Sequence, residues 1–125
     1  MDSIYLDGSK RLPTVILDKK IEKFEISGIS NHSEAGEYYR PILEWIDKYT
    51  KDPLQKTIFE FKMNYYDSVS SLMIFKVMQK LQYLMDYGND VLVRWFYEEN
   101  DESIIETGID FKDIFLIDID LVKQN

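Results

Sequence analysis

The stretch NYYDSVSSLMIFKVMQKL (Asn64–Leu81) decides the fold, because a strand runs directly into a helix there. The alternation of apolar and polar residues over Lys56–Tyr66 predicts the strand. Beyond Asp67, apolar residues recur at intervals of three and four, which predicts a helix that ends before Gly88. A strand that passes at once into a long helix is typical of α/β domains. The predicted core face of the helix consists of Ser70, Ile74, Val77, Met78, Leu81 and Met85.

The same criteria predict further elements on both sides of this pair. The predicted strands are Ser3–Leu6, Thr14–Asp18, Lys23–Gly28, Lys56–Tyr66, Asp90–Tyr97 and Phe115–Val122. The other predicted helices cover residues 34–51 and Glu102–Ile114, and Pro41 either starts or kinks the first of them. The order β-β-β-α-β-α-β-α-β predicts a single α/β domain over residues 1–125. Its sheet should be mixed and mostly parallel, with helices packed on it.

The composition limits which partners and chemistry are expected. The 125 residues include 15 Lys and Arg against 23 Asp and Glu, for a formal net charge of −8. Such an acidic surface repels phosphate backbones and anionic lipid, so neither nucleic acid nor a membrane is expected as a partner. There is no Cys, which excludes disulfides, thiolate metal sites and cysteine nucleophiles. Without a signal-peptide pattern or a long apolar run, we expect a soluble cytoplasmic protein.

No group of residues in the sequence predicts catalysis. His32 is the only histidine and lies in a polar loop, without a nucleophile motif or a glycine-rich phosphate loop. The acidic stretch Glu98–Glu102 could hold a divalent cation together with Asp118 and Asp120, but it lacks the ligand spacing and the glycine of a calcium loop. A solvated loop that starts the next helix is favoured. We therefore expect a non-enzymatic protein with no metal and no cofactor.

Two roles remain open for Ser68, at the junction of strand and helix. Serine and aspartate are preferred helix N-caps, because a side-chain oxygen accepts a hydrogen bond from a free N–H of the first turn. Ser68 could instead be a phosphorylation switch, since a phosphate at a helix N-terminus meets free N–H groups and the positive end of the helix dipole. The two roles are compatible.

The outer side of the same helix predicts a docking surface for a partner protein. Large apolar side chains away from the core face are more than a solvated helix needs. The alternative that a neighbouring helix covers them stays open. The predicted partner-binding residues are Asp67, Ser71, Leu72, Phe75, Gln79 and Tyr83.

Three segments resemble known regulatory proteins. The strand that ends in Asp67 and Ser68 at the start of a helix resembles the STAS fold of anti-sigma-factor antagonists, in which a partner kinase phosphorylates the serine. ISGIS (residues 26–30) followed by YYRPILEW (residues 38–45), and VLVRWFYEENDESIIETG (residues 91–108), are similar to segments of the SiaC-type regulatory phosphoproteins of bacteria. The resemblance to this STAS-like family covers nearly the whole chain, and it implies a STAS-like fold.

The resemblance also implies a function. Where the family usually reads Asn-Thr-Ser-Ser, any residue and Lys, this chain reads Asp67 to Leu72, so Ser68 takes the place of the phosphorylated threonine and the lysine is missing. A serine/threonine kinase with an ATPase-type fold and a metal-dependent phosphatase would act on Ser68. The unphosphorylated form would bind and activate a diguanylate cyclase, raising cyclic-di-GMP and promoting biofilm formation or aggregation. Alternatives are an anti-sigma-factor antagonist that binds an anti-sigma kinase, and a small-ligand or metal-binding domain that uses the acidic loop.

Overall fold

The strands form one mixed sheet in which spatial order follows chain order. The computed structural model describes residues 1–124, and within them the sheet has six strands in the order β1-β2-β3-β4-β5-β6. The strands β1 to β3 pair antiparallel, whereas β3 to β6 pair parallel. This confirms the predicted mixed, mostly parallel sheet. The strands are β1 (Ile4–Leu6), β2 (Thr14–Asp18), β3 (Lys23–Ser30), β4 (Lys56–Tyr66), β5 (Asp90–Glu98) and β6 (Asp118–Gln124).

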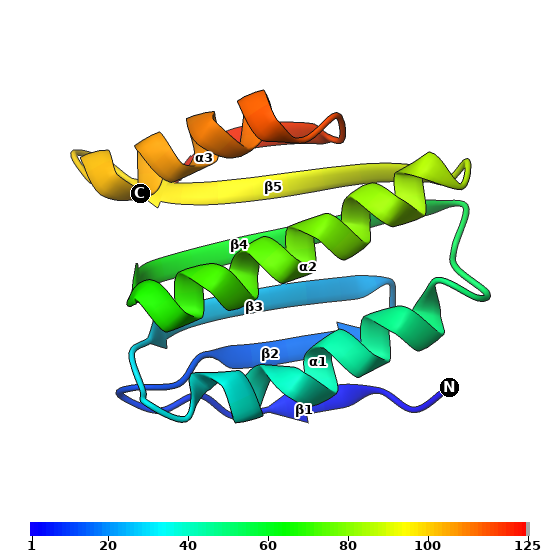
Figure 1. The fold of residues 1–125 in the computed structure, drawn as a ribbon, viewed down its shortest axis with the longest axis horizontal. Coiled ribbons are helices and arrows are strands. Elements are labelled where there is room, and N and C mark those ends of the chain that lie inside the picture. The colour runs from blue at the N-terminus through cyan, green and yellow to red at the C-terminus, as the bar shows by residue number, and fades with distance from the viewer. Residues whose placement is uncertain (125) are drawn as a thin grey trace.

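All three helices of residues 1–124 cover the same face of this sheet (Figure 1). They are α1 (Ala35–Tyr49), α2 (Ser68–Asp86) and α3 (Glu102–Ile114). Each helix connects one parallel strand to the next strand along the sheet, always in the same direction. Because such crossovers are almost always right-handed, every helix arrives on the same side. Among these helices, none is both long and apolar enough to span a membrane.

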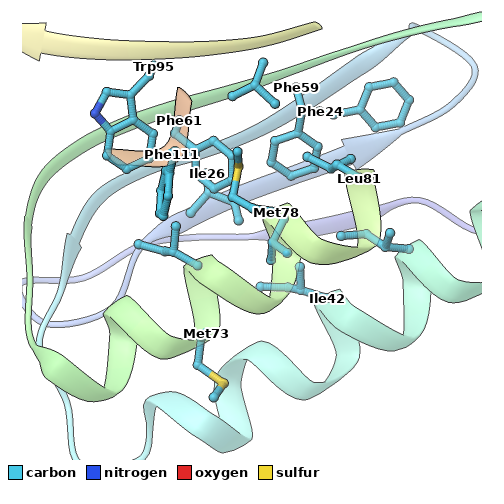
Figure 2. Close-up of a cluster of buried hydrophobic side chains, with 14 of the residues drawn as sticks. Phe24, Ile26, Ile42, Phe59, Phe61, Met73, Met78, Leu81, Trp95 and Phe111 are labelled. Atoms are coloured by element: carbon cyan, nitrogen blue, oxygen red, sulfur yellow. The ribbon is translucent and has the colours of Figure 1, made fainter. Parts of the chain in front are cut away.

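The core lies between the helices and the covered face of the sheet. Along β4, Phe59 and Phe61 point to the helices and are buried, whereas Glu60 and Lys62 point to the open face and are half-buried. This is the two-residue period of a strand with one covered face. Figure 2 shows aromatic rings from the sheet meeting aliphatic side chains of α1 and α2 and the Phe111 ring of α3.

Three details differ from the sequence predictions. The helix α1 begins at Ala35, so Pro41 lies inside it and does not start it. Met85, predicted to belong to the core face of α2, is only half-buried near the end of that helix. The last strand begins at Asp118 and not at Phe115. The segment before it is not paired as a strand, because the N–H groups of Leu116 and Ile117 donate to Oε1 of Gln82 on α2, at 2.7 and 3.2 Å.

Candidate functional site

The junction of β4 and α2 gives Asp67 and Ser68 different roles. Asp67 is the N-cap of α2, because its carboxylate accepts a hydrogen bond of 2.9 Å from the N–H of Ser70. Its backbone also joins two strands, since its N–H donates to the carbonyl of Ser30 at the end of β3, at 3.0 Å. Ser68 is the first residue of the helix and its side chain is exposed. The capping role considered for Ser68 is therefore wrong, since the adjacent aspartate performs it.

The carboxylate of Asp67 is stabilised as an anion. Partial burial opposes its ionisation, but the hydrogen bonds from Ser70 and the nearby charge of Arg11 outweigh burial and hold the pKa of the Asp67 carboxyl below its usual value. Asp67 is thus ionised at neutral pH, and its negative charge lies at the positive end of the helix dipole, where it stabilises α2.

Ser70 is held in a buried hydroxyl cluster, which we define as Ser30, Tyr39 and Ser70. All three side chains are fully buried. The hydroxyl of Ser30 donates to that of Ser70 at 2.6 Å, and the hydroxyl of Tyr39 donates to that of Ser30 at 3.2 Å. Burial raises the pKa of Tyr39 to about 12, so its phenol remains a donor at neutral pH. The hydroxyl cluster therefore links β3, α1 and the first turn of α2, two residues after the exposed Ser68.

We predict that Ser70→Ala lowers the free energy of unfolding by about 1–2 kcal/mol, because the buried hydroxyl of Ser30 then loses its acceptor. Ser71→Ala is the matched control, since Ser71 is half-buried one residue further along the same helix. The control should change the free energy by less than about 0.5 kcal/mol. Urea unfolding measures both. Equal stability of the two variants would contradict an energetic role for the hydroxyl cluster.

The predicted docking residues divide into exposed and covered ones. Leu72 and Tyr83 are each 52% exposed on the outer side of α2, and Gln79 between them is exposed as well. We call Leu72, Gln79 and Tyr83 the α2 surface. Phe75 is half-buried instead, with its ring centroid 6.3 Å from that of Phe111 and 5.3 Å from that of Phe115. Neighbouring residues of the domain therefore cover Phe75, as the alternative to a docking surface predicted, whereas they leave the α2 surface exposed.

A groove runs beside the α2 surface, between α1 and α2. Its volume is about 710 Å³. An ion pair between Lys80 and Asp47, with 2.5 Å between the charged atoms, bridges the two helices there. At the end of α2 the rings of Tyr83 and Tyr87 lie 4.5 Å apart. The groove thus combines an aromatic end with polar walls. Its lining residues are Leu43, Asp47, Thr50, Lys76, Gln79, Lys80 and Tyr83.

The other polar candidates have structural contacts. Asp101 caps α3, because its carboxylate accepts a hydrogen bond of 3.2 Å from the N–H of Ile104, so the acidic loop starts that helix as predicted. The Nδ1 atom of His32 accepts a hydrogen bond of 2.9 Å from the N–H of Glu34 at the start of α1. Within residues 1–124, no three His, Asp or Glu side chains are grouped so that they could hold a metal ion.

Residues 6–124 match the family model of the SiaC family regulatory phosphoproteins. The chain belongs to the SiaC family. SiaC of Pseudomonas aeruginosa has the same fold, with a TM-score of 0.89 and 15% sequence identity over 99% of this chain and 100% of that one. The same fold occurs in the crystal structure of diguanylate cyclase SiaD in complex with its activator SiaC from Pseudomonas aeruginosa. The SiaC of that complex has a TM-score of 0.90 and 16% sequence identity, over 97% of this chain and 99% of that one. An uncharacterized protein of Pseudomonas aeruginosa (strain UCBPP-PA14) is 18% identical over 113 residues, 90% of each chain.

The SiaC-family segments identified in the sequence mostly build the scaffold around the junction. Gly108 of α3 packs so closely against Trp95 of β5 that a Cβ atom there would lie 2.6 Å from the indole ring. The indole N–H of Trp95 in turn donates to the carbonyl of Ile104, at 2.8 Å. Two of these segments also contribute Ser30 and Tyr39 to the hydroxyl cluster. Sequence reasoning missed this cluster, because nothing local to either residue indicates that it contacts Ser70.

Proposed function

We propose that this SiaC-family protein is a non-enzymatic regulator whose binding state is set by reversible phosphorylation of Ser68. The observation that carries the proposal is the difference among the three serines at the start of α2. Ser68 is exposed, Ser71 is half-buried, and Ser70 is fully buried in the hydroxyl cluster. A kinase needs a hydroxyl that it can reach, so the exposure of Ser68 supports it as the phosphoacceptor over Ser70.

The partner that we propose is a diguanylate cyclase, bound and activated by the unphosphorylated form. A SiaC protein with the same fold is the activator of the cyclase SiaD in the complex described above. In this chain Ser68 and the α2 surface share one helix, so a phosphate on Ser68 would add about −1.5 to −2 charges to the helix that presents Leu72. A serine/threonine kinase and a metal-dependent phosphatase would set the phosphorylation state, and the protein would act in the cytoplasm.

Phosphopeptide mapping of the protein isolated from its native cells tests the phosphorylation. We expect phosphate on Ser68. Phosphate found only on Ser70 or Ser71 would refute the assignment. Capture of partners from the same cells, followed by mass spectrometry, tests the partner: a diguanylate cyclase supports the proposal, whereas an anti-sigma kinase would support the alternative role as an anti-sigma-factor antagonist.

We predict that Ser68→Asp weakens binding to the cyclase by about tenfold, equal to about 1.4 kcal/mol. The introduced carboxylate adds only one charge and fewer oxygens than a phosphate, so the effect is smaller than that of phosphorylation. Ser68→Ala should bind constitutively. Because Asp67 caps α2, both variants should keep the wild-type melting temperature. Affinity is measured with the purified cyclase, and wild-type affinity of Ser68→Asp would count against control by charge at this position.

A further inference from the structure

Arg11 is fixed beside the end of β3. It lies in the loop between β1 and β2 and is exposed. Its side-chain Nε donates to the carbonyl of Asn31 at 2.9 Å, and the N–H of Asn31 donates to the carbonyl of Arg11 at 2.8 Å. Both the backbone and the side chain of Arg11 are therefore tied to the residue that follows β3.

The same position is next to the phosphorylation site. The residue before Asn31, Ser30, accepts the hydrogen bond from the N–H of Asp67, at 3.0 Å. Asn31 and Asp67 therefore lie at the ends of two paired strands, and Ser68 follows directly. In agreement with this geometry, the charge of Arg11 contributes to the lowered pKa of the Asp67 carboxyl, behind the effects of burial and of the Ser70 hydrogen bonds.

The charge of Arg11 is also available to an anion. The chain has three arginines, and the other two form ion pairs, Arg40 with Glu37 and Arg94 with Glu60. For Arg11 the structure of residues 1–124 shows no carboxylate within ion-pair distance. Since Nε is bound to the Asn31 carbonyl, the two terminal nitrogens of the guanidinium are left to donate elsewhere.

We propose that Arg11 binds the phosphate group of phosphorylated Ser68. This inference rests on the proposed phosphorylation of Ser68 and adds the residue that receives the phosphate. A guanidinium can donate two parallel hydrogen bonds to phosphate oxygens, and charge-assisted bonds of this kind are about twice as strong as neutral ones. The charge of Arg11 would also offset the repulsion between the phosphate and the neighbouring anionic Asp67. The pair would tie the β1–β2 loop to the first turn of α2.

The test uses protein that carries phosphoserine at position 68, introduced during translation by genetic encoding, so that no kinase is needed. The second ionisation of the phosphate is followed by ³¹P NMR as the pH is varied. Its ordinary pKa is about 6, and a bound guanidinium lowers it because it favours the dianion. Arg11→Ala should raise the pKa of the phosphate by roughly 0.5 relative to the unsubstituted chain. Lys10→Ala is the matched control, since Lys10 is an exposed neighbour in the same loop and carries the same charge.

The control should leave the pKa of the phosphate within about 0.1 of that of the unsubstituted chain, because a general change in net charge is screened by salt. An equal pKa in the unsubstituted chain and Arg11→Ala would overturn the proposal, as would equal increases in the two variants. Both side chains are exposed, so neither variant should unfold the domain. A failure of the proposed function itself would be seen separately, as the absence of phosphate on Ser68 in native cells.

Discussion

Gly108→Val should lower the melting temperature of the domain by roughly 10 °C, equal to about 3 kcal/mol. Gly108 is buried on α3, and an added Cβ atom would lie 2.6 Å from the Trp95 ring and 2.5 Å from the Leu121 side chain. Valine adds two further methyl groups to this contact. The helix must then move away from the sheet, which strains the bond from the indole N–H to the Ile104 carbonyl. Thermal unfolding followed by circular dichroism measures the change.

Gly108→Ala separates packing from helix propensity. Alanine is about 1 kcal/mol better than glycine in a helix interior, so a stable variant would be expected if space were available. We expect a loss of about 1–2 kcal/mol instead. Gly36→Ala in α1 is the matched control, because a Cβ atom there meets nothing within 4 Å, and it should stabilise the protein by up to about 1 kcal/mol. The close contact would be unimportant if both alanine variants were stabilised.

Leu72→Glu should weaken cyclase binding by about 30-fold or more, equal to at least about 2 kcal/mol, while the melting temperature stays unchanged. Leu72 is 52% exposed at the end of the α2 surface that is nearest to Ser68, so little packing within the domain is lost. In a complex the carboxylate would be buried without a partner, which is costly. Affinity for the purified cyclase and the melting temperature are measured on the same samples.

Two further variants make this result specific. Leu116→Glu introduces the same charge at an apolar residue that is 80% exposed but lies outside α2, and it should bind normally. Phe75→Ala should chiefly reduce stability, by roughly 1–3 kcal/mol, since its ring packs against Phe111 and Phe115. Equal losses of affinity in Leu72→Glu and Leu116→Glu would show that net charge, and not the α2 surface, governs binding.

The strand-to-helix junction was predictable because its signal is local. Alternation over β4 and helical spacing over α2 locate the junction to within a residue, and Asp67 and Ser68 are both good caps by type. Which of the two caps the helix depends on the turn of the backbone after β4, and that turn is set by pairing with Ser30, 37 positions earlier in the chain. The sequence pattern carries no information on that pairing.

Other features depend on long-range contacts in the same way. Phe75 and Leu72 are equally apolar members of the outer side of α2, and only the position of α3 makes one covered and the other exposed. Residues 115–117 alternate like a strand, and Phe115 and Ile117 are indeed buried. The strand does not begin there because Gln82, more than thirty residues away, binds the N–H groups that a ladder would use.

The agreement between strand order and chain order has a consequence for how the protein is made. Each strand leaves the ribosome after the strand that it pairs with, so the sheet can grow at one edge during synthesis. The antiparallel β1–β3 meander comes first, and each later helix-strand unit extends it by one strand. Among β1 to β6, no strand has to enter between two that are already paired. Parallel partners such as Phe24 and Phe59 lie 35 positions apart in the chain, so each of these pairings has to wait until its connecting helix has been made.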